Sequence, residues 1–252
     1  MIKDFFIGIS YVTRGFGLIQ RPGIRRYVII PLLINILLFA AGIGWLANEF
    51  SGMMDHMLGY LPSWLDWLSW ILWPLFALSI MVIIFYTFTI IANLIGSPFN
   101  SILAEKLEAD LSGQPPGEFA GYAALMKDIG KSLIGELKKL MYLLLWMIPL
   151  LILFIIPGVN ILAPFAWGLF TAWMLSLEYG DYPLGNHGYF FKDVKRVMAE
   201  NRGLSLGFGA AIMLMTFIPV LNFLAMPVGV TGATAMWVER IKGREKGLSA
   251  KN

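Results

Sequence analysis

The sequence predicts an all-α integral membrane protein, and two observations support this fold class. Of the 252 residues, 58% are hydrophobic and 14% are charged, and the mean hydropathy is +0.71. Soluble domains hold about 45–50% apolar and about 25% charged residues, so this apolar surplus does not fit a water-exposed surface. The apolar residues also gather into segments of about 20 residues or more, as membrane spans require. We expect a single membrane domain with two long transmembrane helices, two proline-bent, half-penetrating helical hairpins and an N-terminal amphipathic helix.

The N-terminal segment, residues 1–27, has the pattern of an amphipathic helix on the membrane surface. Apolar residues such as Phe5 and Ile9 recur near helical spacing between polar and basic positions. The first span is predicted over residues 28–47, which hold no charge and have Asn35 as their one strongly polar side chain. Its 19 residues from Val28 to Leu46 would form a helix about 28 Å long, which matches the hydrocarbon core of a bilayer.

The second span is predicted over residues 68–96. The segment before it contains Glu49, Asp55 and Asp66 but neither Lys nor Arg, which marks the side of the membrane opposite the basic N-terminus.

The sequence Gly96-Ser97-Pro98 predicts a turn at the end of the second span. Ser97 suits a helix N-cap and Pro98 the first position of a new helix. We therefore expect helices on the cytoplasmic side over residues 98–140.

Two further apolar regions, residues 141–177 and 204–238, are each interrupted by proline. They share the pattern Ile-Pro-x-x-Asn-x-Leu-Ala, which begins at Ile156 and at Ile218, and the offset of 62 residues indicates an internal repeat. Proline removes a backbone donor and clashes with the preceding turn, so each region should form two short helices joined by a bend. The arms before the bends hold 16 and 15 residues, which favours half-penetrating hairpins over six full spans.

The basic residues give the expected orientation. All 19 Lys and Arg residues fall in four segments: residues 1–27, 98–140, the loop or helix at 178–203, and the basic tail at 239–252. If both hairpins return to the side they start from, every basic residue lies on one face, which the positive-inside rule makes cytoplasmic. Six full spans with both bends outside satisfy the same count.

Several functional classes are excluded or disfavoured. The absence of cysteine and the presence of only two histidines exclude disulfides, thiol nucleophiles and a histidine-rich metal centre. The sequence has no nucleotide-binding loop, metalloprotease motif or serine-triad framework, so neither an enzyme nor a cofactor is expected. The basic residues behind the net charge of +3 flank the apolar spans, as membrane orientation requires. The charge therefore does not indicate a nucleic-acid partner.

Residues 21–26, Arg-Pro-Gly-Ile-Arg-Arg, form the first candidate binding site. Proline suits the start of a helix, where free backbone N–H groups and the helix dipole bind anions. Arg25 and Arg26 add forked donors that suit a tetrahedral oxyanion. On the residues alone, anchoring of the first span to lipid phosphates is the favoured alternative.

Polar residues around the second span form the second candidate. Ser101, Glu105 and Glu108 share one face of the helix expected after Pro98. Such a face is either solvated or lines a pore, and in a pore its carboxylates need basic partners. Asn35 in the first span suits either an interhelical hydrogen bond or a permeation path.

These motifs resemble the CysZ-type sulfate permease family of bacterial inner membranes. The resemblance runs through nearly the whole chain, and it rests on Gln-Arg-Pro-Gly-Ile-Arg-Arg at 20–26, Pro-Phe-Asn at 98–100, Ile-Pro-Gly at 156–158, Asp-Tyr-Pro at 181–183, Asn-His at 186–187 and Gly-Ala-Thr-Ala-Met-Trp-Val at 232–238.

The resemblance implies a multi-pass inner-membrane transporter that takes up sulfate for cysteine synthesis, without an ATPase domain. It implies a homo-oligomer, and it leaves protomers of opposite orientation open beside the single orientation that the charges favour. It further implies that sulfate binds at Gly23, Ile24, Arg25 and Arg26, with a translocation path along Asn35, Ser97, Asn100, Glu105 and Glu108.

Two alternatives stay open at this point. The family often has arginine where this chain has Asp110, so the basic partner of Glu105 and Glu108 is unassigned, with Lys106 or another segment as the options. A function of another class, a membrane scaffold that inserts into one leaflet and binds lipid through its arginines, also fits the hairpins.

Overall fold

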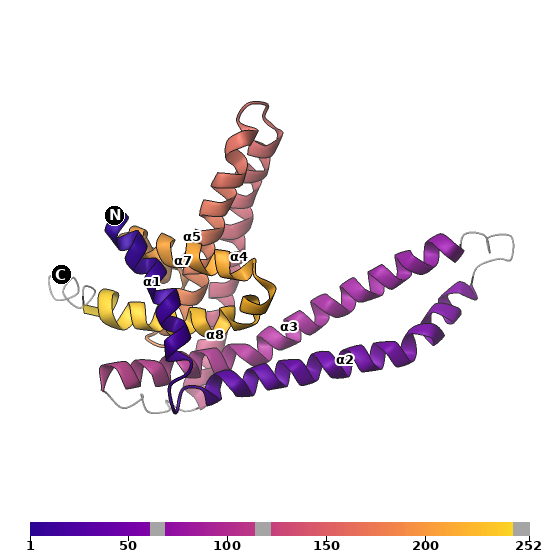
Figure 1. Cartoon of the computed structure of the whole chain (residues 1–252), viewed down its shortest axis with the longest axis horizontal. Coiled ribbons are helices and arrows are strands. Elements are labelled where there is room, and N and C mark those ends of the chain that lie inside the picture. Colours follow the sequence, from indigo (N-terminus) through magenta and orange to yellow (C-terminus); the bar gives the residue numbers. More distant parts are fainter. Residues whose placement is uncertain (61–68, 114–121, 244–252) are drawn as a thin grey trace. The chain divides into compact units, whose positions relative to one another are not determined.

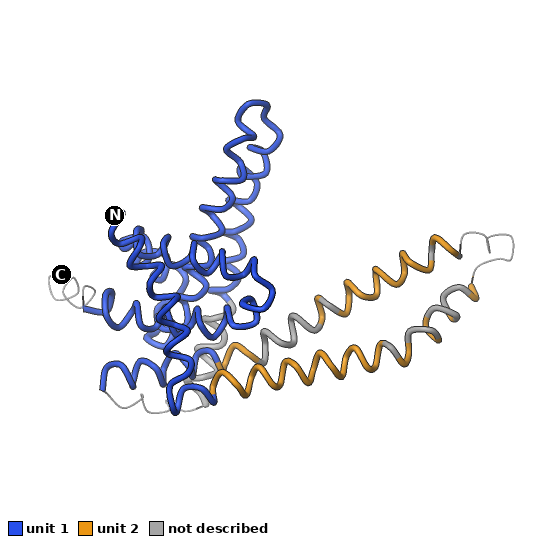
Figure 2. The backbone as a smooth tube through the Cα atoms, viewed as in Figure 1, with its two compact units in different colours: residues 1–26, 100–252 blue, residues 27–99 orange. Residues whose placement is uncertain are grey.

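The computed structural model describes residues 1–60, 69–113 and 122–243, and every regular element within these ranges is a helix. The chain divides into two compact units, residues 1–26 with 100–252 and residues 27–99 (Figure 2). Within the described residues, four helical stretches are long and apolar enough to cross a membrane: Arg26–Leu46, Ile134–Ile155, Asn160–Gly185 and Pro219–Ile241. The predicted all-α membrane fold is therefore confirmed.

The unit of residues 27–99 is a pair of long helices (Figure 1). It contains α2 (Arg26–Leu58) after its first residue, and the part of α3 (Ser69–Ser112) that precedes Asn100. Large apolar side chains such as Leu37 and Leu78 are exposed on both helices. Because helices satisfy their own backbone groups, an apolar exposed surface of this kind suits contact with lipid.

The predicted turn at Gly96 and Ser97 does not form. Instead, α3 runs as one helix of 44 residues through Pro98 to Ser112. Proline removes one backbone hydrogen bond, but the bonds on either side hold the helix together, as happens in other membrane helices. Ser97 is thus an exposed helical residue and not an N-cap.

The first hairpin bends at Pro157 and Gly158. Its elements are α4 (Tyr122–Ile155), the short 3₁₀ helix η2 (Asn160–Leu162) and α5 (Ala163–Gly185). Gly158 has a φ of +82°, a left-handed conformation that glycine adopts without a steric penalty. The first arm is longer than the apolar run from Met141 indicates, because Lys138 and Lys139 interrupt the hydropathy but not the helix. Both arms are long enough to cross a bilayer.

The second hairpin follows a short amphipathic helix. The elements are α6 (Phe191–Glu200), α7 (Arg202–Thr216), α8 (Pro219–Met236) and the π-helix η3 (Trp237–Ile241). The bend is tight: Ile218 is extended, and Pro219 is the first residue of α8. The 15 residues of α7 equal the predicted arm length. Residues 244–252 of the predicted basic tail lie outside the described residues.

The N-terminal helix α1 (Ile2–Leu18) is amphipathic, as predicted. Its buried face includes Tyr11, Val12 and Leu18, whereas Ile2 and Phe6 are 78% and 65% exposed.

Glycines bring the helices of this unit into backbone contact. A Cβ atom on Gly207 of α7 would collide with the carbonyl oxygen of Phe5 in α1, and a Cβ on Gly209 would collide with that of Ala172 in α5. Phe208 between them is fully buried. Small residues at such crossings allow close packing where no hydrophobic force acts between helices in lipid.

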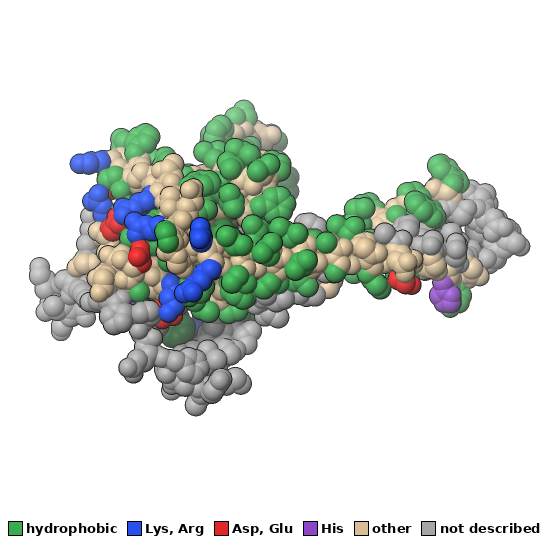
Figure 3. Space-filling view, turned by 60° about the horizontal axis from the view of Figure 1, so that its bottom comes forward, with side chains coloured by type: hydrophobic (Ala, Val, Ile, Leu, Met, Phe, Trp, Pro, Cys, Tyr) green, Lys and Arg blue, Asp and Glu red, His purple; other side chains and the backbone are tan. Residues whose placement is uncertain are grey.

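Charged and apolar side chains occupy different parts of the surface (Figure 3). In the unit of residues 1–26 and 100–252, Lys and Arg side chains gather at one part of the visible surface, while apolar side chains cover the hairpin of α4 and α5. This separation agrees with basic segments on one side of a bilayer.

Candidate functional site

The predicted sulfate-binding residues lie in a turn between α1 and α2. Gly23 has a φ of +87°, which glycine adopts easily but which does not continue a helix. Therefore α2 begins at Arg26 and not at Pro22, where the proline pattern placed the helix start.

Hydrogen bonds close this turn from within. The N–H groups of Ile24 and Arg25 donate to the carbonyl oxygen of Arg21, with N···O distances of 3.1 and 3.2 Å. The Ile24 side chain is 4% exposed and fixes the turn against the protein. The side chains of Arg25 and Arg26 remain exposed, so the guanidinium groups are the donors that this segment presents outward.

An ion pair ties the turn to the end of α3. Arg21 Nη1 donates to Asp110 Oδ2 at 2.5 Å, and both side chains are nearly half exposed. A pair this exposed contributes about 1 kcal/mol or less to stability. Asp110 is thus paired with Arg21.

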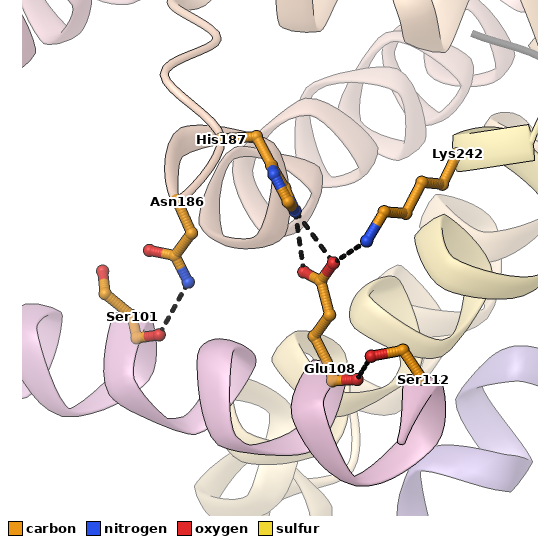
Figure 4. Close-up of polar contacts among 6 residues, drawn as sticks. All are labelled: Ser101, Glu108, Ser112, Asn186, His187 and Lys242. Carbon is orange, nitrogen blue, oxygen red and sulfur yellow. Dashed lines mark hydrogen bonds and ion pairs between the residues drawn. The ribbon is translucent and has the colours of Figure 1, made fainter. Parts of the chain in front are cut away.

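Glu108 in α3 has two basic partners, both from distant segments (Figure 4). His187 Nε2 lies 2.9 Å from each carboxylate oxygen, and Lys242 Nζ donates to Oε1 at 2.6 Å. His187 follows α5 and Lys242 follows η3. These contacts answer the open question for Glu108, because both basic partners come from other segments.

Burial disfavours the charged form of the Glu108 carboxylate, whose side chain is 11% exposed. The hydrogen bonds from His187 and Lys242, and the charges behind them, outweigh this effect and hold the pKa of Glu108 below its ordinary value. Glu108 is therefore a charged, partnered carboxylate at neutral pH.

A second contact holds the same part of α3 to the end of α5. Asn186 Nδ2 donates to the backbone oxygen of Ser101 at 2.9 Å (Figure 4). Between these contacts, Leu103 and Ala104 are fully buried, and Asn100 is 7% exposed. This part of α3, residues 100–112, is consequently fixed in position within its unit.

The remaining predicted path residues are placed separately. Glu105 is half-buried in α3, about 60° around the helix from Glu108. Asn35 and Ser97 belong to the unit of residues 27–99. In the described part of the chain, Asn35 Oδ1 is buried without a hydrogen-bond partner.

Sequence reasoning missed a second charged cluster, at the base of the first hairpin. Lys139 Nζ of α4 lies 2.9 Å from Glu178 and 3.2 Å from Asp181 of α5, and 2.9 Å from Glu136 of its own helix. The lysine side chain is only 10% exposed. The spacing of Glu136 to Lys139 and of Glu178 to Asp181, three residues each on facing arms, was a signal for this contact.

Metal binding has no support in the described ranges 1–60, 69–113 and 122–243, where no group of three or more His, Cys, Asp or Glu residues has a suitable arrangement.

Comparison with known proteins gives the family. Residues 11–227 match the family described as Sulfate transporter CysZ/Etoposide-induced protein 2.4. A protein named Sulfate transporter CysZ from Pectobacterium atrosepticum is 42% identical over 246 residues, covering 97% of this chain and 89% of that protein. The chain belongs to this family.

Other relatives agree. A Sulfate transporter CysZ of Salmonella typhimurium is 43% identical over 233 residues, covering 92% of both chains, and one of Salmonella paratyphi A is 42% identical over 233 residues. The predicted membership of the CysZ family is confirmed. Together with the four apolar helices, these relatives support a multi-pass protein of a bacterial inner membrane.

Proposed function

We propose that this protein transports sulfate across the bacterial inner membrane and supplies sulfate for cysteine synthesis, and that it catalyses no reaction. Support comes from the relatives, which are named as sulfate transporters and match over 92% or more of the chain. The apolar helices and the exposed arginine pair at the start of α2 are consistent with an anion that enters a membrane protein.

Sulfate binds first at Gly23, Ile24, Arg25 and Arg26 in this proposal. The turn positions two adjacent guanidinium groups at the end of the first span, and forked donors suit the oxygen atoms of sulfate. Because two backbone N–H groups of the turn already donate to the carbonyl oxygen of Arg21, sulfate binding relies mainly on the side chains of Arg25 and Arg26 in this proposal.

The onward path includes Asn35, Ser97, Asn100, Glu105 and Glu108. A carboxylate in an anion path would repel sulfate if it were unpaired. Lys242 neutralises Glu108, and the hydrogen bond from His187 occupies both carboxylate oxygens. The cluster therefore offers sulfate a polar wall without net negative charge.

We propose that the functional form is a homo-oligomer. Irregular backbone such as the bends at Pro157 and Pro219 is tolerated inside a bilayer only where protein or water covers it. Neighbouring protomers would provide this cover and complete the pore. Both a single orientation and opposite orientations of the protomers are compatible with this arrangement, and labelling of single-cysteine variants from each side of the membrane distinguishes them.

The direct test is uptake of radiolabelled sulfate into proteoliposomes. We expect the variant Arg25→Gln/Arg26→Gln to lose at least about tenfold in uptake, because each charge-assisted contact contributes about 1.5–3 kcal/mol. The control Lys138→Gln/Lys192→Gln removes two exposed positive charges elsewhere and should transport normally. Excess chloride should compete weakly.

Unchanged uptake by the arginine variant would contradict the binding site. Folded wild-type protein that transports no sulfate but remodels vesicles would instead favour the scaffold function.

A further inference from the structure

A cavity of about 370 Å³ lies beside the start of α1, away from the turn that holds Arg25 and Arg26. Its walls come from three segments that are distant in sequence: Asp4 and Ile7 of α1, Glu200 to Arg202 at the junction of α6 and α7, and Arg240 of η3. Its volume is at the lower end of the range of about 300–1,000 Å³ that is usual for small-ligand sites. It therefore suits a group of modest size.

The charged side chains in the wall are of both signs. Arg202 and Arg240 provide two guanidinium groups, and Asp4 and Glu200 provide two carboxylates. Arg202 Nε donates to the carbonyl oxygen of Ala199 at 3.0 Å, which leaves the other guanidinium donors of Arg202 for a ligand. A wall with both forked cations and carboxylates matches a ligand that itself carries an anion and a cation.

The cavity adjoins a surface that suits the bilayer. Ile2 and Phe6, on the same helical segment as Asp4, are 78% and 65% exposed. An amphipathic helix with such residues lies in the headgroup region with its apolar face towards the acyl chains. Polar groups of the cavity consequently lie at the level where phospholipid headgroups are found.

We propose that this cavity binds a phosphate ester that carries an ammonium group, of the phosphoethanolamine type. Arg202 and Arg240 hold the phosphate oxygens, and Asp4 and Glu200 accept hydrogen bonds from the ammonium group. Each carboxylate already has one partner, because Asp4 pairs with the Met1 α-ammonium at 3.1 Å and Glu200 pairs with Arg196 at 3.4 Å, so the ligand uses the remaining acceptor positions. The group has two possible sources, the headgroup of phosphatidylethanolamine or soluble phosphoethanolamine. Because the ligand contacts all three segments, its binding links α1, the junction of α6 and α7, and the C-terminal η3.

The test measures thermal unfolding of delipidated protein in detergent. The probes are short-chain phosphatidylethanolamine, phosphatidylglycerol and phosphatidylcholine, and soluble phosphoethanolamine. At saturating ligand we expect phosphatidylethanolamine to raise Tm by about 3 °C or more. Arg202→Gln/Arg240→Gln should abolish the rise, and Lys138→Gln/Lys192→Gln, which changes the same number of exposed charges, should keep it.

A second variant keeps the test decisive if the arginine variant does not fold. Asp4→Asn/Glu200→Gln retains both guanidinium groups, so it should still respond to phospholipid but lose its preference for the ethanolamine headgroup over phosphatidylglycerol. An equal rise with soluble phosphoethanolamine assigns the site to the soluble compound, and a rise with the lipid alone assigns it to the headgroup.

Equal responses of the wild type to all three lipids, a rise that persists in the arginine variant, or no rise with any probe would overturn the proposal.

Discussion

The two proline-bent hairpins share a sequence motif but have different surroundings. In the first hairpin, 11% of the most apolar stretch of α4 and 28% of the most apolar stretch of α5 are buried. In the second hairpin, 61% of the apolar stretch that contains α8 is buried. The first therefore presents most of its surface outward, and the second forms much of the core of its unit. A common bend motif does not determine where a hairpin packs.

The two bends differ at a position of the repeat that affects the backbone conformation. Gly158 of the first copy corresponds to Val220 of the second, and only the glycine has a left-handed φ. Valine avoids that conformation because its Cβ collides with the following carbonyl. The second bend is accordingly tighter. There α8 begins at Pro219 itself, whereas in the first bend α5 begins only at Ala163, after the 3₁₀ helix η2.

Glycine placement explains the difference in burial. In the second hairpin, a Cβ atom on Gly207, Gly209 or Gly232 would collide with the backbone of another helix. In the first, a Cβ on Gly135 would have no atom of another segment within 4 Å, and a Cβ on Gly168 or Gly180 would meet only a methionine side chain and no backbone.

The largest effect should come from filling a glycine crossing. Gly209→Ala is expected to destabilise the protein by about 3 kcal/mol, because the new methyl group meets the backbone of α5 and the helices must separate. The matched change Gly135→Ala should be neutral or stabilising by about 0.5–1 kcal/mol, since alanine favours a helix. Chemical or thermal unfolding in detergent measures both. Equal losses would contradict the role of the crossing.

The next effect concerns the charged base of the first hairpin. Lys139→Met removes the cation that three neighbouring carboxylates share. We expect a loss of only about 2 kcal/mol, since all three carboxylates are partly exposed. The neighbouring exposed Lys138→Met should change stability little. The further changes Glu178→Gln and Asp181→Asn should restore part of the loss in the Lys139 variant, and a cycle of unfolding measurements tests this. Additive losses would show that the cluster does not act as a unit.

The elements of the fold that depend on local sequence patterns could be predicted from the sequence, whereas those that depend on tertiary contacts could not. Hydropathy and proline spacing predicted the first span, the amphipathic α1 and both bends, because each depends on local sequence patterns. The length of α4 was underestimated because Lys139 reads as a break in hydropathy, although carboxylates of the facing helix satisfy it. Likewise, Pro98 was predicted to start a helix that in fact continues through it.

Local sequence patterns could not identify the partners of Glu108. Lys242 is 134 residues away in the sequence and lies in a segment that resembles any basic tail. His187 belongs to an Asn-His pair that the family resemblance singled out, but its role needs the fold that brings the end of α5 to α3. Roles that depend on tertiary contacts follow only from the assembled helices.

A smaller effect should separate the two bends. Gly158→Ala is expected to cost about 1 kcal/mol, because alanine is strained at a φ of +82°. Val220→Ala, at the equivalent position of the exposed second bend, should cost less, since no special conformation is required there. Unfolding midpoints of the two variants provide the comparison. A greater loss at Val220 would indicate that the bends are set by contacts and not by backbone conformation.

The smallest effect tests how Glu108 joins the ends of both hairpins, through His187 after α5 and Lys242 after η3. Its pKa is lowered in the folded protein, so its contribution is present above its ordinary pKa near 4.5 and is lost as the pH falls below that value through the folded pKa. The stability difference between wild type and Glu108→Gln, about 1 kcal/mol at pH 7, should therefore shrink below about pH 4.5. Glu105→Gln, which removes a carboxylate from the same helix, is the control. A difference for Glu108→Gln that stays constant down to pH 3 would mean that the contacts depend on shape and not on charge.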